Sequence, residues 1–304
     1  MSPKAAPVAG HWPPATDRSQ GPEAPTARRR PRTHRRLPSR PPVIPLKDNI
    51  PTDRRAVVTI ALIMVNVIVY LLSLRHGGSL VGGPTDAVSV KYGAIPFEFS
   101  HPGRHCGLAA NPMGAAQIAC EGQLGVFGRA GPQPPTWETA VTGMFLHGGL
   151  LHIAGNMLFL WIFGNNVEDA MGRGRFLAFY LLGGLVALAG QILVDAGSTA
   201  PTIGASGAVA AVLGGYILLY PRARVLTLVF IIFFVTLIEL PALVMLGLWF
   251  AEQIVFGYTG LTRPVGGGGG GVAYFAHVGG FAFGLLLIRA FVRRRSGSPP
   301  LVAS

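Results

Sequence analysis

Charged residues are scarce in this chain of 304 residues, and their scarcity excludes an ordinary soluble domain. Only 12% of the residues are charged and 50% are hydrophobic, and the mean hydropathy is +0.46. Soluble domains carry about 25% charged residues, so this composition is typical of a membrane protein. Transporters are often built from internal repeats, and this sequence has no such repeat. The composition therefore favours a membrane protein of another kind.

Large apolar residues are almost missing from the first 55 residues. This segment holds twelve of the 25 prolines and much of the net charge of +12. It cannot bury enough surface to offset its ordering entropy, so we expect residues 1–55 to form a disordered basic tail. No aromatics are interleaved with its arginines, which argues against nucleic-acid binding, and no cleavage site follows a short apolar core. We expect the tail to orient the chain and to touch anionic lipid.

Apolar stretches long enough to cross a bilayer, about 18 residues or more, occur six times. They lie at residues 56–74, 147–165, 174–194, 203–220, 240–257 and 272–292. The expected fold class is all-α, a polytopic bundle of six transmembrane helices over residues 56–295. A long outer loop at residues 76–144 interrupts the bundle, and residues 296–304 form a short C-terminal tail.

A seventh apolar stretch, at residues 225–238, is excluded from this count by the positive-inside rule. Arginines precede the first span, follow the second and the fourth, and stand at residues 293–295 after the last. Six spans place all of them on the inner side, whereas seven would place the last group outside. We therefore expect cytoplasmic termini, a plasma or inner membrane, and an interfacial or re-entrant position for residues 225–238.

Polar residues occur at matching depth in three of these spans. His152 and Asn156 lie near the start of the second span, Ser206 near the start of the fourth, and His277 near the start of the sixth. All three spans enter from the outer side, so at 1.5 Å per residue the four side chains lie in roughly the outer third of the bilayer. Polar groups are costly in hydrocarbon, and their convergence indicates a functional site.

Small residues indicate that the fourth and sixth spans pack closely. Ser206 begins a stripe of small residues that recurs every four positions, and His277 shares a helical face with Gly280 and Gly284. A serine and a histidine in contact are sufficient for nucleophilic acyl transfer, because the histidine removes the hydroxyl proton. The alternative is an ordinary packing motif between glycine-rich membrane helices.

Three motifs resemble those of the rhomboid intramembrane serine proteases. They are GASG at residues 204–207, AH with a following GxxxG at residues 276–284, and HGGLLHIAGN at residues 147–156. The resemblance covers about residues 56–292. It implies a catalytic dyad, with Ser206 as nucleophile and His277 as general base and then general acid toward the leaving amine. The implied reaction is cleavage of peptide bonds in or next to the transmembrane segments of membrane-protein substrates.

The same resemblance implies an oxyanion hole made by His152, Asn156 and the backbone amide of Ser206. His152 and Asn156 are i, i+4 neighbours on one helical face, and donors in a water-poor site stabilise a developing oxyanion. Gly204 would let a substrate backbone approach the nucleophile. His147 lies off that face, and the resemblance gives it a structural role.

Metal ions and other cofactors are not expected. Several histidines raise the question of zinc, but no acidic or cysteine ligand accompanies them at matching depth and the HExxH pattern is absent. The expected partners are transmembrane protein substrates and membrane lipids, and the sequence leaves the oligomeric state open. A catalytically silent rhomboid-like factor in binding or quality control would keep the fold and lose the dyad, whereas this chain retains the residues of the dyad.

The outer loop contains both cysteines of the chain, Cys106 and Cys120. Outside the cytoplasm they would form a disulfide, and two unpaired thiols are the alternative. Trp137 fits an interfacial anchor, although Trp137-Glu138 stands where many family members have Trp-Arg.

Two further features leave alternatives open. Six consecutive glycines at residues 266–271 form either a flexible linker or a mobile cap over the site. Glu252, in the outer half of the fifth span, either lines a substrate entrance or makes a structural hydrogen bond. Glu168 lies at a span end and is interpreted as solvated.

Overall fold

The structure is a computed structural model, and it describes most of the chain. The described residues are 43–110, 116–123, 126, 130–231, 234–262 and 272–292. The first 42 residues, the glycines at 266–271, the arginines at 293–295 and the C-terminal tail at 296–304 lie outside the described residues.

Helices dominate the described residues, and five are long and apolar enough to cross a membrane. These five are α1 (Val57–Ser73, extended by the 3₁₀ turn η1, Leu74–His76), the segment Leu150–Met171, α7 (Arg173–Val194), α9 (Ala242–Thr262) and α10 (Tyr274–Phe291). The segment Leu150–Met171 comprises α5 (Leu150–Phe159), the π-helical turn η3 (Leu160–Gly164) and α6 (Asn165–Met171). The predicted helical, multi-pass membrane fold is confirmed.

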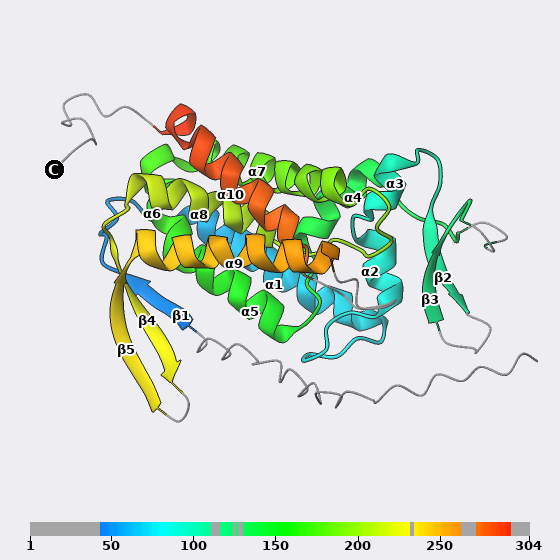
Figure 1. Cartoon of the computed structure of the whole chain (residues 1–304), viewed down its shortest axis with the longest axis horizontal. Coiled ribbons are helices and arrows are strands. Elements are labelled where there is room, and N and C mark those ends of the chain that lie inside the picture. The colour runs from blue at the N-terminus through cyan, green and yellow to red at the C-terminus, as the bar shows by residue number, and fades with distance from the viewer. Residues whose placement is uncertain are drawn as a thin grey trace, which may run out of the picture. The chain divides into compact units, whose positions relative to one another are not determined.

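The predicted fourth span is a helix but a short one. It is α8 (Ser206–Leu219), with 14 residues, and residues 207–217 are all buried. Figure 1 shows α8 surrounded by the longer helices. Large apolar side chains on α1, α7 and α9 are exposed instead, with Met64 54% and Leu248 52% accessible. The bundle therefore turns apolar side chains outward and encloses α8, which carries Ser206 at its first position.

The contact between α8 and α10 depends on glycine. A β-carbon on Gly280 would collide with the carbonyl oxygen of Gly207, and one on Gly284 would collide with that of Ala211. On α8, a β-carbon on Gly214 would meet the carbonyl oxygen of Phe281. Each helix thus brings its backbone against a glycine of the other, as small residues in membrane helices allow.

The segment between α1 and α5 contains short elements. They are α2 (Asp86–Tyr92), α3 (Pro96–Ser100), β2 (Cys106–Ala110), β3 (Ala116–Cys120), α4 (Thr136–Thr142) and the 3₁₀ turn η2 (Gly143–Phe145). Cys106 and Cys120 face each other in the β2–β3 ladder and are joined by a disulfide. The Glu98 carboxylate accepts the Cys106 N–H at 2.7 Å, and burial raises the pKa of Glu98. Trp137, at the start of α4, is 70% exposed.

The described residues of the apolar stretch 225–238, which are 225–231 and 234–238, form strands. They fall in β4 (Arg224–Ile231) and β5 (Phe234–Pro241), an antiparallel pair to which β1 (Val43–Asp48) adds a third strand. The run is rich in Val, Ile, Thr and Phe, which favour strands. Figure 1 shows this sheet at the end of the bundle near α6, away from the β2–β3 hairpin.

The expectation of disorder through residue 55 is wrong for residues 43–48, which form β1. One Asp48 carboxylate oxygen accepts from the Tyr216 hydroxyl at 2.6 Å and from the Asn166 side-chain amide at 2.5 Å. Burial raises the pKa of Asp48. Strand β1 is therefore held by its pairing with β4 and by two buried hydrogen bonds to Asp48. All of these partners lie more than 100 residues away in the sequence.

The expectation that Glu168 is solvated is also wrong. Glu168 is 3% exposed, and its carboxylate accepts from the Val58 N–H at 3.0 Å and from the Thr59 N–H and hydroxyl at 2.8 Å. The first N–H groups of a helix have no partner within it, and a carboxylate stabilises that helix end. Glu168 on α6 therefore caps α1.

Candidate active site

Ser206 and His277 lie in contact at the seam between α8 and α10. Ser206 is the first residue of α8, His277 lies in the first turn of α10, and 2.8 Å separates the serine Oγ from the histidine Nε2. His277 is 8% exposed, whereas Ser206 is half-buried. This distance is that of a hydrogen bond between a nucleophile and its base.

His277 has a second partner that the sequence analysis missed. Its Nδ1 lies 2.7 Å from Oε1 of Gln253 on α9, and Gln253 is 6% exposed. The sequence analysis singled out Glu252 instead, whose side chain is exposed. The available signal was an amide inside an apolar span, but the sequence alone did not show which face of α9 meets α10.

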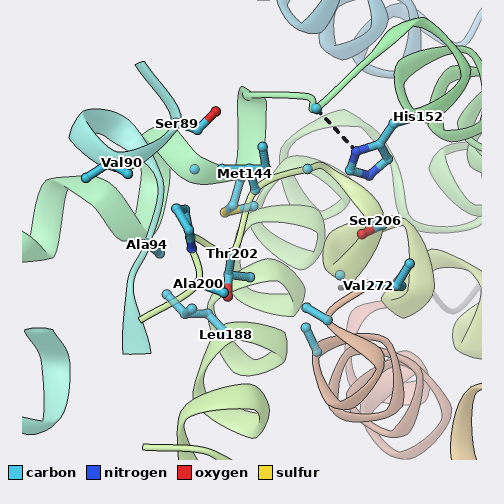
Figure 2. Close-up of a pocket in the computed structure, with 18 of the residues that line it drawn as sticks. Ser89, Val90, Ala94, Met144, His152, Leu188, Ala200, Thr202, Ser206 and Val272 are labelled. Carbon is cyan, nitrogen blue, oxygen red and sulfur yellow. Dashed lines mark hydrogen bonds between the residues drawn. The ribbon is translucent and has the colours of Figure 1, made fainter. Parts of the chain in front are cut away.

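His152 faces the nucleophile from the first turn of α5. Its Nδ1 accepts a hydrogen bond from the Gly148 N–H at 3.4 Å, which is drawn as a dashed line in Figure 2. Because Nδ1 is the acceptor, the proton of the neutral imidazole lies on Nε2. A β-carbon on Gly204 would lie 2.7 Å from that Nε2 and 3.6 Å from the Ser206 Oγ. Gly204, at a φ of 121°, therefore makes room for His152, whereas the sequence analysis assigned that space to a substrate backbone.

Asn156 lies one turn after His152 on α5. It is 8% exposed, and its Nδ2 has no hydrogen-bond partner within the described part of the chain. Buried polar groups are normally paired, so this N–H₂ is a donor without an acceptor beside the site. Asn156 does not line the cavity described below.

His147 holds the turn that precedes the nucleophile. It is fully buried, its Nε2 accepts the Ala205 N–H at 3.4 Å, and its Nδ1 lies 3.3 Å from the Phe145 carbonyl oxygen. The Ala205 N–H can only donate, so the lone pair of His147 lies on Nε2 and the proton of its neutral ring lies on Nδ1. The neutral imidazole thus donates through Nδ1 and accepts through Nε2, which fixes the backbone directly before Ser206.

A cavity of about 1010 Å³ opens onto these groups. Ser206, His277, His152 and Gly204 line it, and it reaches Ser89 on α2 and the β2–β3 hairpin. Figure 2 shows Ser206 and His152 facing this space from different segments, with Thr202 of the preceding loop nearby. The arrangement offers a nucleophile, a base and a donor to one bound carbonyl group.

Metal ligands are not gathered at this cavity. In the part of the chain that the structure describes, no group of three His, Cys, Asp or Glu side chains is placed to hold a metal ion. The side chains around Ser206 are suited to acyl transfer by a nucleophile and a base.

Known proteins match this part of the chain. A family model described as the Rhomboid domain matches residues 134–294. Rhomboid protease GluP of Bacillus subtilis (strain 168) is 42% identical over 78 residues, which are 26% of this chain and 15% of that protein. Rhomboid protein 1, mitochondrial, of Saccharomyces cerevisiae is 30% identical over 148 residues, 47% of this chain and 38% of that protein.

The matched relatives differ in what their names state. The presenilin-associated rhomboid-like protein, mitochondrial, of Homo sapiens is 34% identical over 84 residues, 26% of this chain and 22% of that protein. The Bacillus subtilis relative is named a protease, whereas the human relative is named rhomboid-like. The alignments span well under half of each of these relatives.

Proposed function

Because the chain belongs to the rhomboid family, we propose that it is an intramembrane serine endopeptidase acting through Ser206 and His277. The observation that carries the proposal is the 2.8 Å contact between the Ser206 Oγ and the His277 Nε2. The substrate class is a membrane protein cleaved in or next to a transmembrane segment. Helical amides are engaged in hydrogen bonds, so segments with helix-weakening residues should be preferred.

The reaction would proceed in two acyl-transfer steps. The Ser206 Oγ attacks the scissile carbonyl carbon while its proton passes to the His277 Nε2. The resulting imidazolium gives that proton to the leaving amine, and an acyl-enzyme remains. Water from the cavity then attacks the acyl carbon while His277 takes its proton. As the bond from the acyl carbon to the Ser206 Oγ breaks, His277 returns that proton to the Oγ, and the carboxylic product leaves.

The oxyanion of each tetrahedral intermediate needs donors. The Ser206 N–H, the His152 Nε2–H and the Asn156 Nδ2 are our candidates. His152 is supported by the Gly148 bond that leaves the proton on its Nε2, and Asn156 by its unpaired buried Nδ2. One such donor is worth about 3 kcal/mol of transition-state stabilisation.

Labelling and proteolysis would test the proposal directly. We expect a fluorophosphonate probe to label the purified protein in detergent, and the protein to cleave a model transmembrane substrate. Ser206→Ala should abolish both, and His277→Ala should abolish cleavage, because the two residues act as one unit. Ser89→Ala is the matched control, since Ser89 lines the same cavity and should leave both activities unchanged.

Two results would overturn the assignment. Cleavage that survives in Ser206→Ala would remove the nucleophile from that position. A folded parent protein that neither reacts with the probe nor cleaves would favour the rhomboid-like binding or quality-control factor.

The membrane and the orientation belong to the same proposal. We propose a plasma or inner membrane, and the arginine pattern supports an orientation with both termini on its inner side. The two cysteines of the chain are paired, so a single cysteine introduced near the C-terminus would report its side by accessibility to a membrane-impermeant maleimide. Labelling from the outer side of intact cells would refute this orientation.

A further inference from the structure

Gln253 is a polar side chain buried inside a membrane-spanning helix. An amide in such surroundings is costly unless its groups are hydrogen-bonded. Both of its polar atoms have partners: Oε1 lies 2.7 Å from the His277 Nδ1, and Nε2 donates to the Trp249 carbonyl oxygen at 3.3 Å. The indole of Trp249 also lies beside the His277 ring, with 5.8 Å between the centroids.

These contacts determine the direction of the amide. The Trp249 carbonyl oxygen only accepts hydrogen bonds, so the NH₂ group of Gln253 must face it. The amide oxygen therefore faces His277, and because this oxygen also only accepts, the His277 Nδ1 must carry a proton. A flipped amide would set two oxygens against each other at Trp249.

The proton on Nδ1 determines the role of the other ring nitrogen. A neutral imidazole has one proton, so Nε2 is left with a lone pair directed at the Ser206 Oγ, 2.8 Å away. The other tautomer would place a lone pair against the Gln253 oxygen and an N–H against the serine. Only the first tautomer can remove the serine proton.

We infer that Gln253 is a positioning residue, which holds His277 in the tautomer and ring orientation that a general base requires. The inference rests on the proposed protease function. When the proton moves from the Ser206 Oγ to Nε2, the imidazolium keeps its Nδ1–H on the Gln253 oxygen, the negative end of the amide dipole. Gln253 exchanges no proton, and unlike a carboxylate it adds no charge to the interior.

Two variants separate this role from packing. Gln253→Met keeps the length of the side chain and removes the strong acceptor, whereas Gln253→Glu, protonated in this buried position, keeps an acceptor oxygen for His277 and a hydroxyl that can donate to the Trp249 carbonyl oxygen. We expect the Met variant to lower kcat by about 10- to 100-fold, the worth of one such hydrogen bond in the transition state, with KM changed by less than about twofold. Gln253→Glu should recover most of the loss, and Val255→Met, at a position of α9 that is 57% exposed, should match the parent.

Rates would be expressed per folded enzyme, counted by titration with the serine-directed probe. A parent-like kcat in Gln253→Met would overturn the inference. Equal losses in the Met and Glu variants would also overturn it, because they would reduce Gln253 to a packing residue.

A second measurement does not depend on proteolysis. Nitrogen-15 NMR of the parent protein with labelled histidine, assigned with His277→Ala, reports which ring nitrogen carries the proton. We expect the Nδ1–H tautomer for His277, and loss of that single tautomer in Gln253→Met. An Nε2–H tautomer in the parent would refute the inference even if the Met variant fails to fold. If the parent neither cleaves nor reacts at Ser206, the protease proposal fails, and the NMR result still decides the tautomer.

Discussion

Replacing Asp48 with alanine should lower the free energy of unfolding by about 2–5 kcal/mol. The change removes the acceptor shared by the Tyr216 hydroxyl and the Asn166 amide, and those donor residues are 0% and 1% exposed. A buried donor left without a partner costs about 1–3 kcal/mol, and two are created together. Asp48→Asn keeps an oxygen for both donors and should cost about 1 kcal/mol or less.

A double-mutant cycle would separate the loss of the two hydrogen bonds to Asp48 from a general loosening of β1. In a Tyr216→Phe background one of the two donors is already gone, so Asp48→Ala should cost about 1–2 kcal/mol less than in the parent. Lys47→Ala, at the exposed neighbouring position of β1, is the control and should stay within about 0.5 kcal/mol of the parent. Unfolding would be followed by titrating mixed micelles with sodium dodecyl sulfate. Additive losses, or a loss below about 0.5 kcal/mol for Asp48→Ala, would refute the reasoning.

Three further predictions concern the site, the helix seam and pH. Asn156→Ala should lower kcat by about 10- to 1000-fold with little change in KM, because an oxyanion donor acts mainly in the transition state. A normal kcat per titrated active site would remove Asn156 from the mechanism. Gly284→Ala should destabilise the protein by about 1–3 kcal/mol and lower kcat, because its new methyl group meets the Ala211 carbonyl oxygen; Gly247→Ala on α9, with open space around it, should do neither. Burial raises the pKa of Glu98 above its unfolded value, so its stabilising contribution is full below the unfolded pKa and is lost as pH rises through the folded one. Glu98→Gln should therefore flatten the fall in Tm that begins as pH rises past the unfolded glutamate pKa of about 4.3, and an unchanged slope would contradict this.

The helices and the contact between Ser206 and His277 could be predicted because their signals lie within single segments. Span length, the spacing of small residues and the depth of polar residues each require only a few consecutive turns of one helix. Parity of the spans then places Ser206 and His277 at the same side of the bilayer. The stripes of small residues predict the close approach that glycines such as Gly280 and Gly284 provide.

The remaining features depend on segments that no local pattern connects. Strand β1 pairs with β4 about 180 residues later in the chain, and Glu168 caps a helix that begins 111 residues earlier. The composition of the first 55 residues therefore gave the wrong expectation for residues 43–48, and the position of Glu168 at a span end gave the wrong one for its side chain. Gln253 was missed for a related reason: one step along α9 turns a side chain by about 100°, and only the packed structure shows that Gln253, not Glu252, meets His277.

The shortness of α8 has a consequence for the depth of the reaction. Fourteen residues extend about 21 Å, whereas the hydrocarbon layer is about 30 Å thick. The helix is therefore about 9 Å shorter than that layer, and its first residue, Ser206, lines the cavity. We expect water to reach the serine through this cavity, although longer helices surround α8. The level at which a peptide bond would be cut is thus set by where α8 begins, so adding one helical turn before Ser206 would shift that level by about 5.4 Å.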